Sequence, residues 1–93
     1  MRIGAVVLVL LLAGCAQGQR VQGLITDIEV QDGRTVAITV DSGDESTRIL
    51  TPADVDYGFD LDHLEEHRDE KLPVSVKVQE RGGEEIALTI EDG

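Results

Sequence analysis

The sequence predicts a mainly β domain of five strands and one short helix. In three segments, residues 36–40, 74–78 and 86–90, aliphatic residues alternate with polar or small ones. This period of two is typical of a strand with one buried face. Glycine-containing turn sequences separate the predicted strands, and one segment, residues 60–71, carries apolar side chains at helical spacing instead.

The first predicted strand, residues 21–30, is unusual because its apolar residues occupy both odd-numbered and even-numbered positions, and therefore both faces of the strand. The two sets are Val21 with Ile25, and Leu24 with Ile28 and Val30. Gly23 permits a bend or a bulge near the start of the strand. A long, bent strand that serves two sides of a barrel would carry such a change of parity.

The remaining strands follow in order along the chain. Residues 36–40 form the second strand, with Thr35, Ala37, Thr39 and Asp41 expected to point outward. Residues 45–51 form a shorter third strand, which Pro52 closes. The last two strands, 74–78 and 86–90, are expected to bury their valines, isoleucines and Leu88. The three turns are Gln31-Asp32-Gly33, Ser42-Gly43-Asp44 and Arg81-Gly82-Gly83.

A short surface helix is predicted over residues 60–71, between the third and fourth strands. Leu61 and Leu64 share one face of this helix, and the remaining residues are mostly charged. Asp62 with Glu65 forms a capping box near the start of this helix.

This order of elements, with a bent first strand that contains glycine, resembles the OB-fold, a five-stranded Greek-key barrel with a helix between strands 3 and 4. Among exported bacterial proteins the chain is similar to small OB-fold proteins of the cell envelope. Their Val-x-Gly-x-Ile start and their strand ending in Asp-x-Gly are matched by residues 21–25 and 41–43. The resemblance implies a binding module whose ligands are not nucleic acids.

The first fourteen residues are typical of a secretory signal peptide. Arg2 precedes an apolar run over residues 3–13, which is shorter than the roughly 20 residues that a membrane-spanning helix needs. Leu12-Ala13-Gly14-Cys15 resembles the lipobox of bacterial lipoproteins. That resemblance implies diacylglycerol on the Cys15 thiol, cleavage before it, and a fatty acyl chain such as palmitate on the new amino terminus. A plain signal peptide, an uncleaved anchor and a buried Cys15 are the alternatives.

These features divide the chain into a signal peptide (residues 1–14), a lipidated cysteine with a tether (15–20) and one OB-fold-like domain (21–93). The expected location is the cell envelope, where the lipid on Cys15 holds the protein on a membrane. If the host is Gram-negative, Ala16 after the cysteine favours the outer membrane.

The amino-acid composition argues against one class of function for this domain, nucleic-acid binding. The chain carries 19 acidic and 8 basic residues, for a formal net charge of −11. Nucleic-acid binding needs lysine and arginine on a basic surface and aromatic rings for stacking, so we expect no nucleic-acid partner. The single cysteine excludes an intramolecular disulfide.

No set of residues predicts an enzyme. Cys15 is assigned to lipid, and the serines have no histidine pattern beside them. The segment His63-Leu64-Glu65-Glu66-His67 matches the H-x-x-E-H motif of inverted zinc proteases, but those are far larger chains. Two exposed histidines on an acidic helix is the simpler interpretation. Peripheral Zn²⁺ binding by His63 and His67 with a nearby carboxylate stays open.

An acidic stretch, residues 54–65, offers a second possible cation site. Its acids are Asp54, Asp56, Asp60, Asp62 and Glu65, at positions 1, 3, 7, 9 and 12 of a twelve-residue loop. The spacing partly resembles an EF-hand Ca²⁺ loop, but Phe59 stands where that loop needs glycine, and no helix is predicted before it. A solvated loop that leads into a helix with an acidic first turn is the alternative.

The sequence therefore predicts a membrane-anchored envelope lipoprotein that acts as a small non-enzymatic binding or interaction module, without a cofactor and with an envelope protein as its partner. The alternative function is a divalent-cation module, for Ca²⁺ or Zn²⁺, that uses residues 54–67. A third interpretation assigns the acidity to solubility or to salt adaptation.

Overall fold

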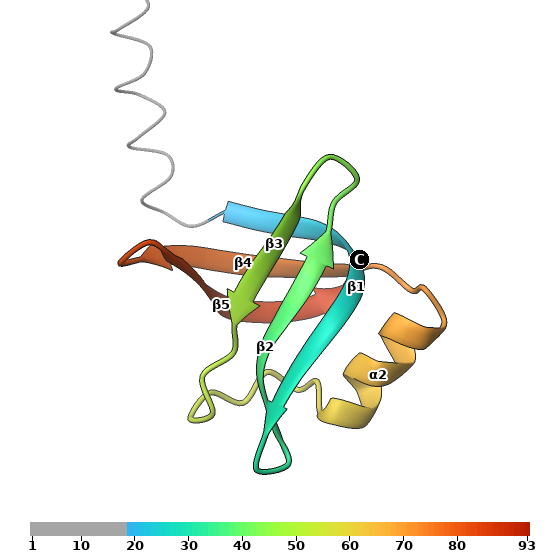
Figure 1. The fold of residues 1–93 in the computed structure, drawn as a ribbon, viewed down its shortest axis with the longest axis horizontal. Coiled ribbons are helices and arrows are strands. Elements are labelled where there is room, and N and C mark those ends of the chain that lie inside the picture. Colours follow the sequence, from blue (N-terminus) through green and yellow to red (C-terminus); the bar gives the residue numbers. More distant parts are fainter. Residues whose placement is uncertain (1–18) are drawn as a thin grey trace, which may run out of the picture.

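The computed structural model describes residues 19–93. Its elements are β1 (Gln19–Gln31), β2 (Arg34–Asp41), β3 (Ser46–Leu50), α2 (Leu61–Asp69), β4 (Val74–Arg81) and β5 (Glu84–Asp92). The strands pair in the order β1-β2-β3-β5-β4, and β1 also pairs with β4, so the strands form a closed ring (Figure 1). Every pairing is antiparallel except that of β3 with β5. The predicted mainly β domain of five strands and one short helix is confirmed.

Strand β1 closes the ring because it bends and pairs with two different strands, β4 and β2. Its first five residues pair with β4, from Gln19 opposite Val78 to Gly23 opposite Val74. From Leu24 onward the same strand pairs with β2. Figure 1 shows the two halves running in different directions. The bend predicted at Gly23 is confirmed, and Gln19 and Arg20, which the sequence assigned to the tether, are strand residues.

The interior of the ring holds a small aliphatic core. Its buried members are Ile25, Ile38, Val40, Ile49, Leu64, Val74, Val76, Val78, Ala87 and Ile90. The helix contributes Leu64, which is 1% exposed, and α2 lies against β1. The two aromatic residues, Tyr57 and Phe59, lie in the loop between β3 and α2 and pack against the edge of this core. The core therefore derives its stability from burial of medium-sized aliphatic side chains.

The expected alternation fails in β5, where Ala87 is buried and Leu88 is 39% exposed. The register explains the difference, because Thr89 pairs with Lys77 while Ala87 pairs with the next β4 residue, Val78. Leu88 is thus an extra residue, a β-bulge that reverses the faces of the residues before it. The prediction that Leu88 is buried and Ala87 exposed was wrong.

Ala37, expected to point outward from β2, is fully buried all the same. Ala37 lies between Glu29 of β1 and Leu50 of β3. Arg48 of β3 donates two hydrogen bonds to the Glu29 carboxylate, of 2.7 and 2.8 Å, so this ion pair links the two strands that flank β2. The guanidinium also holds the pKa of Glu29 below its ordinary value.

The helix is shorter than predicted and starts from a different cap. It covers Leu61–Asp69 rather than residues 60–71. Its N-cap is Asp60, whose side chain accepts a hydrogen bond of 2.9 Å from the backbone N–H of His63. The predicted capping box of Asp62 with Glu65 is therefore wrong by two positions, because Asp60 supplies the oxygen that satisfies the first turn.

Within residues 19–93, no helix is both long enough and apolar enough to cross a membrane.

We predict that Gly23→Ala destabilises the domain strongly. A Cβ atom at Gly23 would overlap the carbonyl oxygen of Asp41, so either the β1 bend or the end of β2 must move. Overpacking of this kind costs about 1–3 kcal/mol or more. Urea denaturation followed by circular dichroism measures the loss. The control is Gly33→Ala, which meets no atom within 4 Å and carries only the cost of a positive φ of 78°. An equal loss in both variants would contradict the role assigned to Gly23.

Candidate functional site

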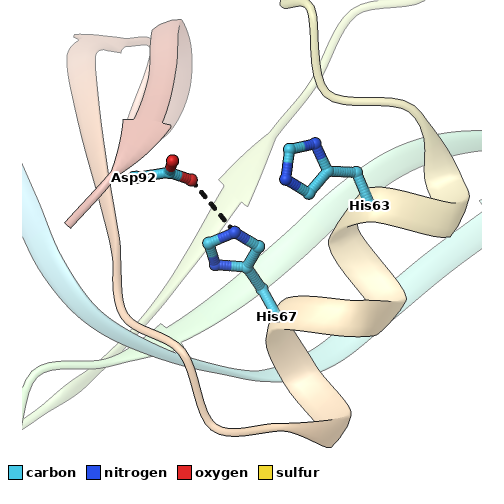
Figure 2. Close-up of side chains that lie close together, drawn as sticks. All are labelled: His63, His67 and Asp92. Carbon is cyan, nitrogen blue, oxygen red and sulfur yellow. Dashed lines mark ion pairs between the residues drawn. The ribbon is translucent and has the colours of Figure 1, made fainter.

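Three side chains that could bind a metal ion lie together where the helix approaches the end of β5. They are His63 and His67 of α2 and Asp92, and Figure 2 shows both imidazole rings on the same side of the helix with Asp92 facing His67. One ligand atom from each residue lies within 4.8 Å of the other two. The histidines share a face because residues four apart are neighbours along a helix. Asp92 reaches them because β5 pairs with β4 up to its last residue, Asp92 opposite Val74.

The ring of His67 is held in place by the end of its own helix. Lys71 follows the helix with a φ of 56°, and the backbone N–H of Leu72 donates to the His67 carbonyl at 2.9 Å. This pattern is a Schellman motif, which turns the chain back over the last helical turn. The turn brings the Leu72 carbonyl oxygen to 3.1 Å from Nδ1 of the His67 ring. The residue is 4% exposed, so its ring has little freedom to rotate.

The other ring nitrogen of His67, Nε2, lies 3.0 Å from Oδ1 of Asp92. The two partners differ in exposure, because the side chain of His67 is 5% exposed and that of Asp92 is 75% exposed. The His67–Asp92 pair therefore sits at the boundary between the interior and solvent. Both ring nitrogens of His67 face an oxygen atom.

His63 is half-buried and is positioned by an aromatic contact. Its ring stacks on Phe59, with ring centroids 4.2 Å apart and an angle of 4° between the planes. The centroids of His63 and His67 are 5.0 Å apart. The hollow around this group has a volume of about 360 Å³ and is also bordered by Glu66, Leu72 and Pro73. We refer to His63, His67 and Asp92 as the histidine cluster.

A second hollow, the cleft, lies on another side of the helix, beside the β1–β2 turn. Its volume is about 250 Å³. Its lining combines apolar side chains with hydroxyl and charged groups: Gly33, Arg34, Thr35, Thr51, Pro52, Ala53, Val55, Asp56, Tyr57, Phe59, Asp60, Leu61, Leu64 and Ile90. Phe59 thus separates the cleft from the histidine cluster, because it lines the first and stacks on His63 of the second.

Hydrogen bonds fix the polar side chains around the cleft. The hydroxyl of Tyr57 donates to the Ala87 carbonyl oxygen at 2.8 Å, and that of Thr51 donates to the Thr35 carbonyl oxygen at 3.1 Å. Burial raises the pKa of Tyr57, and the negative charge of Asp54 raises it further. These two hydrogen bonds tie the loop after β3 to strand β5 and to the start of β2.

The five acids predicted to form a Ca²⁺ loop take separate structural roles. Asp56 accepts a hydrogen bond of 2.9 Å from the N–H of Gly58, which makes a local turn, and Asp60 caps the helix. Asp54 and Asp62 are exposed, and Glu65 is half-exposed. In residues 19–93, the histidine cluster is the only group of three or more metal-binding side chains that lie within reach of one ion.

Sequence reasoning named His63 and His67 but missed Asp92. The histidines carry a local signal, since their spacing of four residues places them on one helical face. Asp92 has no such signal, because only the pairing of β5 with β4 brings it near the helix. Cys15, predicted to carry lipid, and the predicted signal peptide lie outside the described residues.

Comparison of the chain with protein-family models, with curated proteins and with solved structures gives no match in any of the three.

The only tyrosine of the chain offers a direct test of the cleft geometry. We predict that the near-ultraviolet absorbance of tyrosinate titrates above the ordinary pKa of about 10. Asp54→Asn should lower this pKa partway, because burial is the larger cause and remains. Since the folded pKa is the higher one, the contribution of Tyr57 to stability is complete below the unfolded pKa and is lost as pH rises through the folded pKa. Asp62→Asn is the control, and an unshifted midpoint in the unaltered protein would refute the geometry.

Proposed function

We propose that this chain is a small non-enzymatic binding module of the bacterial cell envelope, held on a membrane by lipid attached to Cys15. The lipobox-like sequence Leu12-Ala13-Gly14-Cys15, after a charged residue and an apolar run, supports export and lipid attachment. Two or three acyl chains suffice for stable membrane association, at about 0.8 kcal/mol per buried CH₂. The strand that begins at Gln19 supports a short tether that keeps the domain close to the membrane.

We further propose that the domain is an OB-fold. Support comes from the strand order β1-β2-β3-β5-β4, from the β1 strand shared between β2 and β4, and from a helix placed between β3 and β4. These features agree with a five-stranded Greek-key barrel. A fold of this kind supports many functions, so the proposed binding role depends on the cleft and not on the fold.

The observation that carries the binding role is the cleft between the β1–β2 turn, the β3–α2 loop and the start of α2. A volume of about 250 Å³ is below the range of roughly 300–1,000 Å³ that is usual for small-molecule sites. It suits one or two side chains that a partner protein inserts. Val55, 42% exposed at its rim, and Phe59 offer apolar contact, while Asp56 and Asp60 favour a partner with a basic residue beside its apolar one. The partner we propose is an envelope protein.

Charge argues against nucleic acid as that partner. OB-folds bind oligonucleotides on the face of strands 2 and 3. Here that region carries the Glu29–Arg48 ion pair, which neutralises the arginine, and the whole chain has a net charge of −11. Phosphate groups would be repelled and would release few counterions.

Lipid attachment is tested by Cys15→Ser in the native host. We expect a clickable fatty acid to label the unaltered protein in membranes, and the variant to lose both the label and the membrane association, because serine cannot form the thioether. Gel fluorescence and membrane fractionation measure the two effects. A Cys15→Ser protein that keeps its full label would disprove lipid attachment.

Binding through the cleft is tested by a photoreactive phenylalanine analogue at Val55 in cells. We expect one discrete cross-linked protein adduct in the membrane fraction, detected by immunoblotting. The same analogue at Leu88 is the matched control, since Leu88 is 39% exposed but does not line the cleft. No adduct at position 55, or the same adduct from both positions, would argue against this surface.

A further inference from the structure

The histidine cluster brings two imidazole rings and one carboxylate within 4.8 Å of one another. Nδ1 of His67 lies 3.1 Å from the Leu72 carbonyl oxygen, which can only accept a hydrogen bond. The tautomer that satisfies this contact carries its proton on Nδ1. In the neutral ring this leaves a lone pair on Nε2, which faces Oδ1 of Asp92 at 3.0 Å. Two acceptors at this distance repel each other unless a cation lies between them.

Two cations can satisfy this arrangement, a proton or a metal ion. A proton on Nε2 would give an imidazolium paired with Asp92, and that pair would need no third residue. A third side chain with a metal-binding atom lies there, because His63 is on the same face of α2 with that atom within 4.8 Å of those of His67 and Asp92 (Figure 2). Histidines that bind metal commonly donate their other N–H to a backbone carbonyl, and Nδ1 of His67 lies 3.1 Å from such an oxygen, that of Leu72.

We propose that His63, His67 and Asp92 bind a Zn²⁺ ion or a transition-metal ion of the same class. Imidazole nitrogen with one carboxylate oxygen is a typical ligand set for zinc, whereas Ca²⁺ and Mg²⁺ take oxygen ligands. Nε2 of His67 and Oδ1 of Asp92 supply two ligands, His63 the third, and water the fourth. The site goes beyond the proposed binding module, since it lies outside the cleft and does not depend on lipid.

The cluster needs only a small adjustment to enclose the ion. Ligand atoms about 2.1 Å from zinc in a tetrahedral site lie about 3.4 Å from one another. Nε2 of His67 and Oδ1 of Asp92, 3.0 Å apart, are already near this spacing. His63 is half-exposed and can approach by sliding in the plane of its stack on Phe59. The 75% exposed side chain of Asp92 is equally free to adjust.

Bound metal would connect two parts of the chain that the strands alone leave separate. The histidines belong to α2, while Asp92 is the last residue of β5, and Gly93 beyond it already donates to the Pro73 carbonyl oxygen at 2.9 Å. The ion would join the helix to this strand end. Binding to the folded state alone raises the melting temperature in proportion to the logarithm of metal concentration over Kd.

The test measures Zn²⁺ binding by the full chain, purified in detergent, with a chromogenic chelator as competitor at one fixed pH. We expect one ion per chain with a Kd at or below about 10 μM, and no competition from millimolar Ca²⁺ or Mg²⁺. His63→Ala and Asp92→Asn should each weaken binding at least about tenfold. Both residues are at least partly exposed, so these variants should fold. Asp62→Asn, an exposed carboxylate on the same helix, is the matched control and should bind as the unaltered protein does.

A second measurement identifies the atoms. The chain has only two histidines, so imidazole ¹⁵N spectra can be assigned by His63→Ala. On adding zinc we expect the Nε2 signal of His67 to shift while its Nδ1 keeps the proton. Cys15→Ser should leave both the affinity and these shifts unchanged, which separates this site from the thiol. Any one of three results would overturn the proposal. The first is failure to bind zinc below about 100 μM. The others are zinc binding that His63→Ala and Asp92→Asn leave unaffected, and a His67 ring that is protonated on both nitrogens with zinc present.

Discussion

The closed ring depends on the close approach of the Gly23 backbone to the carbonyl group of Asp41. At this point β1 leaves β4 and begins to pair with β2, and there is no room for a side chain. The bend lets one strand pair with both β4 and β2, which closes the ring. The bend and the bulges of β1 also explain why its apolar residues occupy both parities, since Val21 and Ile28 both pack on the core.

Helix α2 depends on that ring and organises both hollows. Leu64 anchors the helix to the core, and the Asp60 cap fixes where its first turn begins, at the border of the cleft. At the other end, the left-handed Lys71 returns the chain so that the Leu72 carbonyl orients the His67 ring. A nine-residue helix thus borders the cleft at its start and carries both histidines of the cluster along one face.

Charge sets the chemistry of the surface. Three of the few basic side chains, Arg20, Arg48 and Arg68, are committed to ion pairs with neighbouring carboxylates. The remaining acids outnumber the cations that could screen them, and the net charge of −11 raises the local concentration of positive ligands. A basic segment of a partner at the cleft and a divalent ion at the histidine cluster both agree with this surplus.

The sequence by itself determined the number, order and approximate bounds of the five strands, the presence of one short helix and the bend at Gly23, because alternation, turns and glycine are local properties. It also indicated that His63 and His67 share a helical face. Only the tertiary structure decided that Leu88 bulges out of β5 and that Asp92 meets the histidines, because strand register depends on partners far along the chain. The acids of residues 54–65 are close in sequence but take different local roles. Asp56 accepts a hydrogen bond within a turn, Asp60 caps the helix, and Asp54 and Asp62 are exposed. Spacing in the sequence therefore could not show whether these carboxylates lie together.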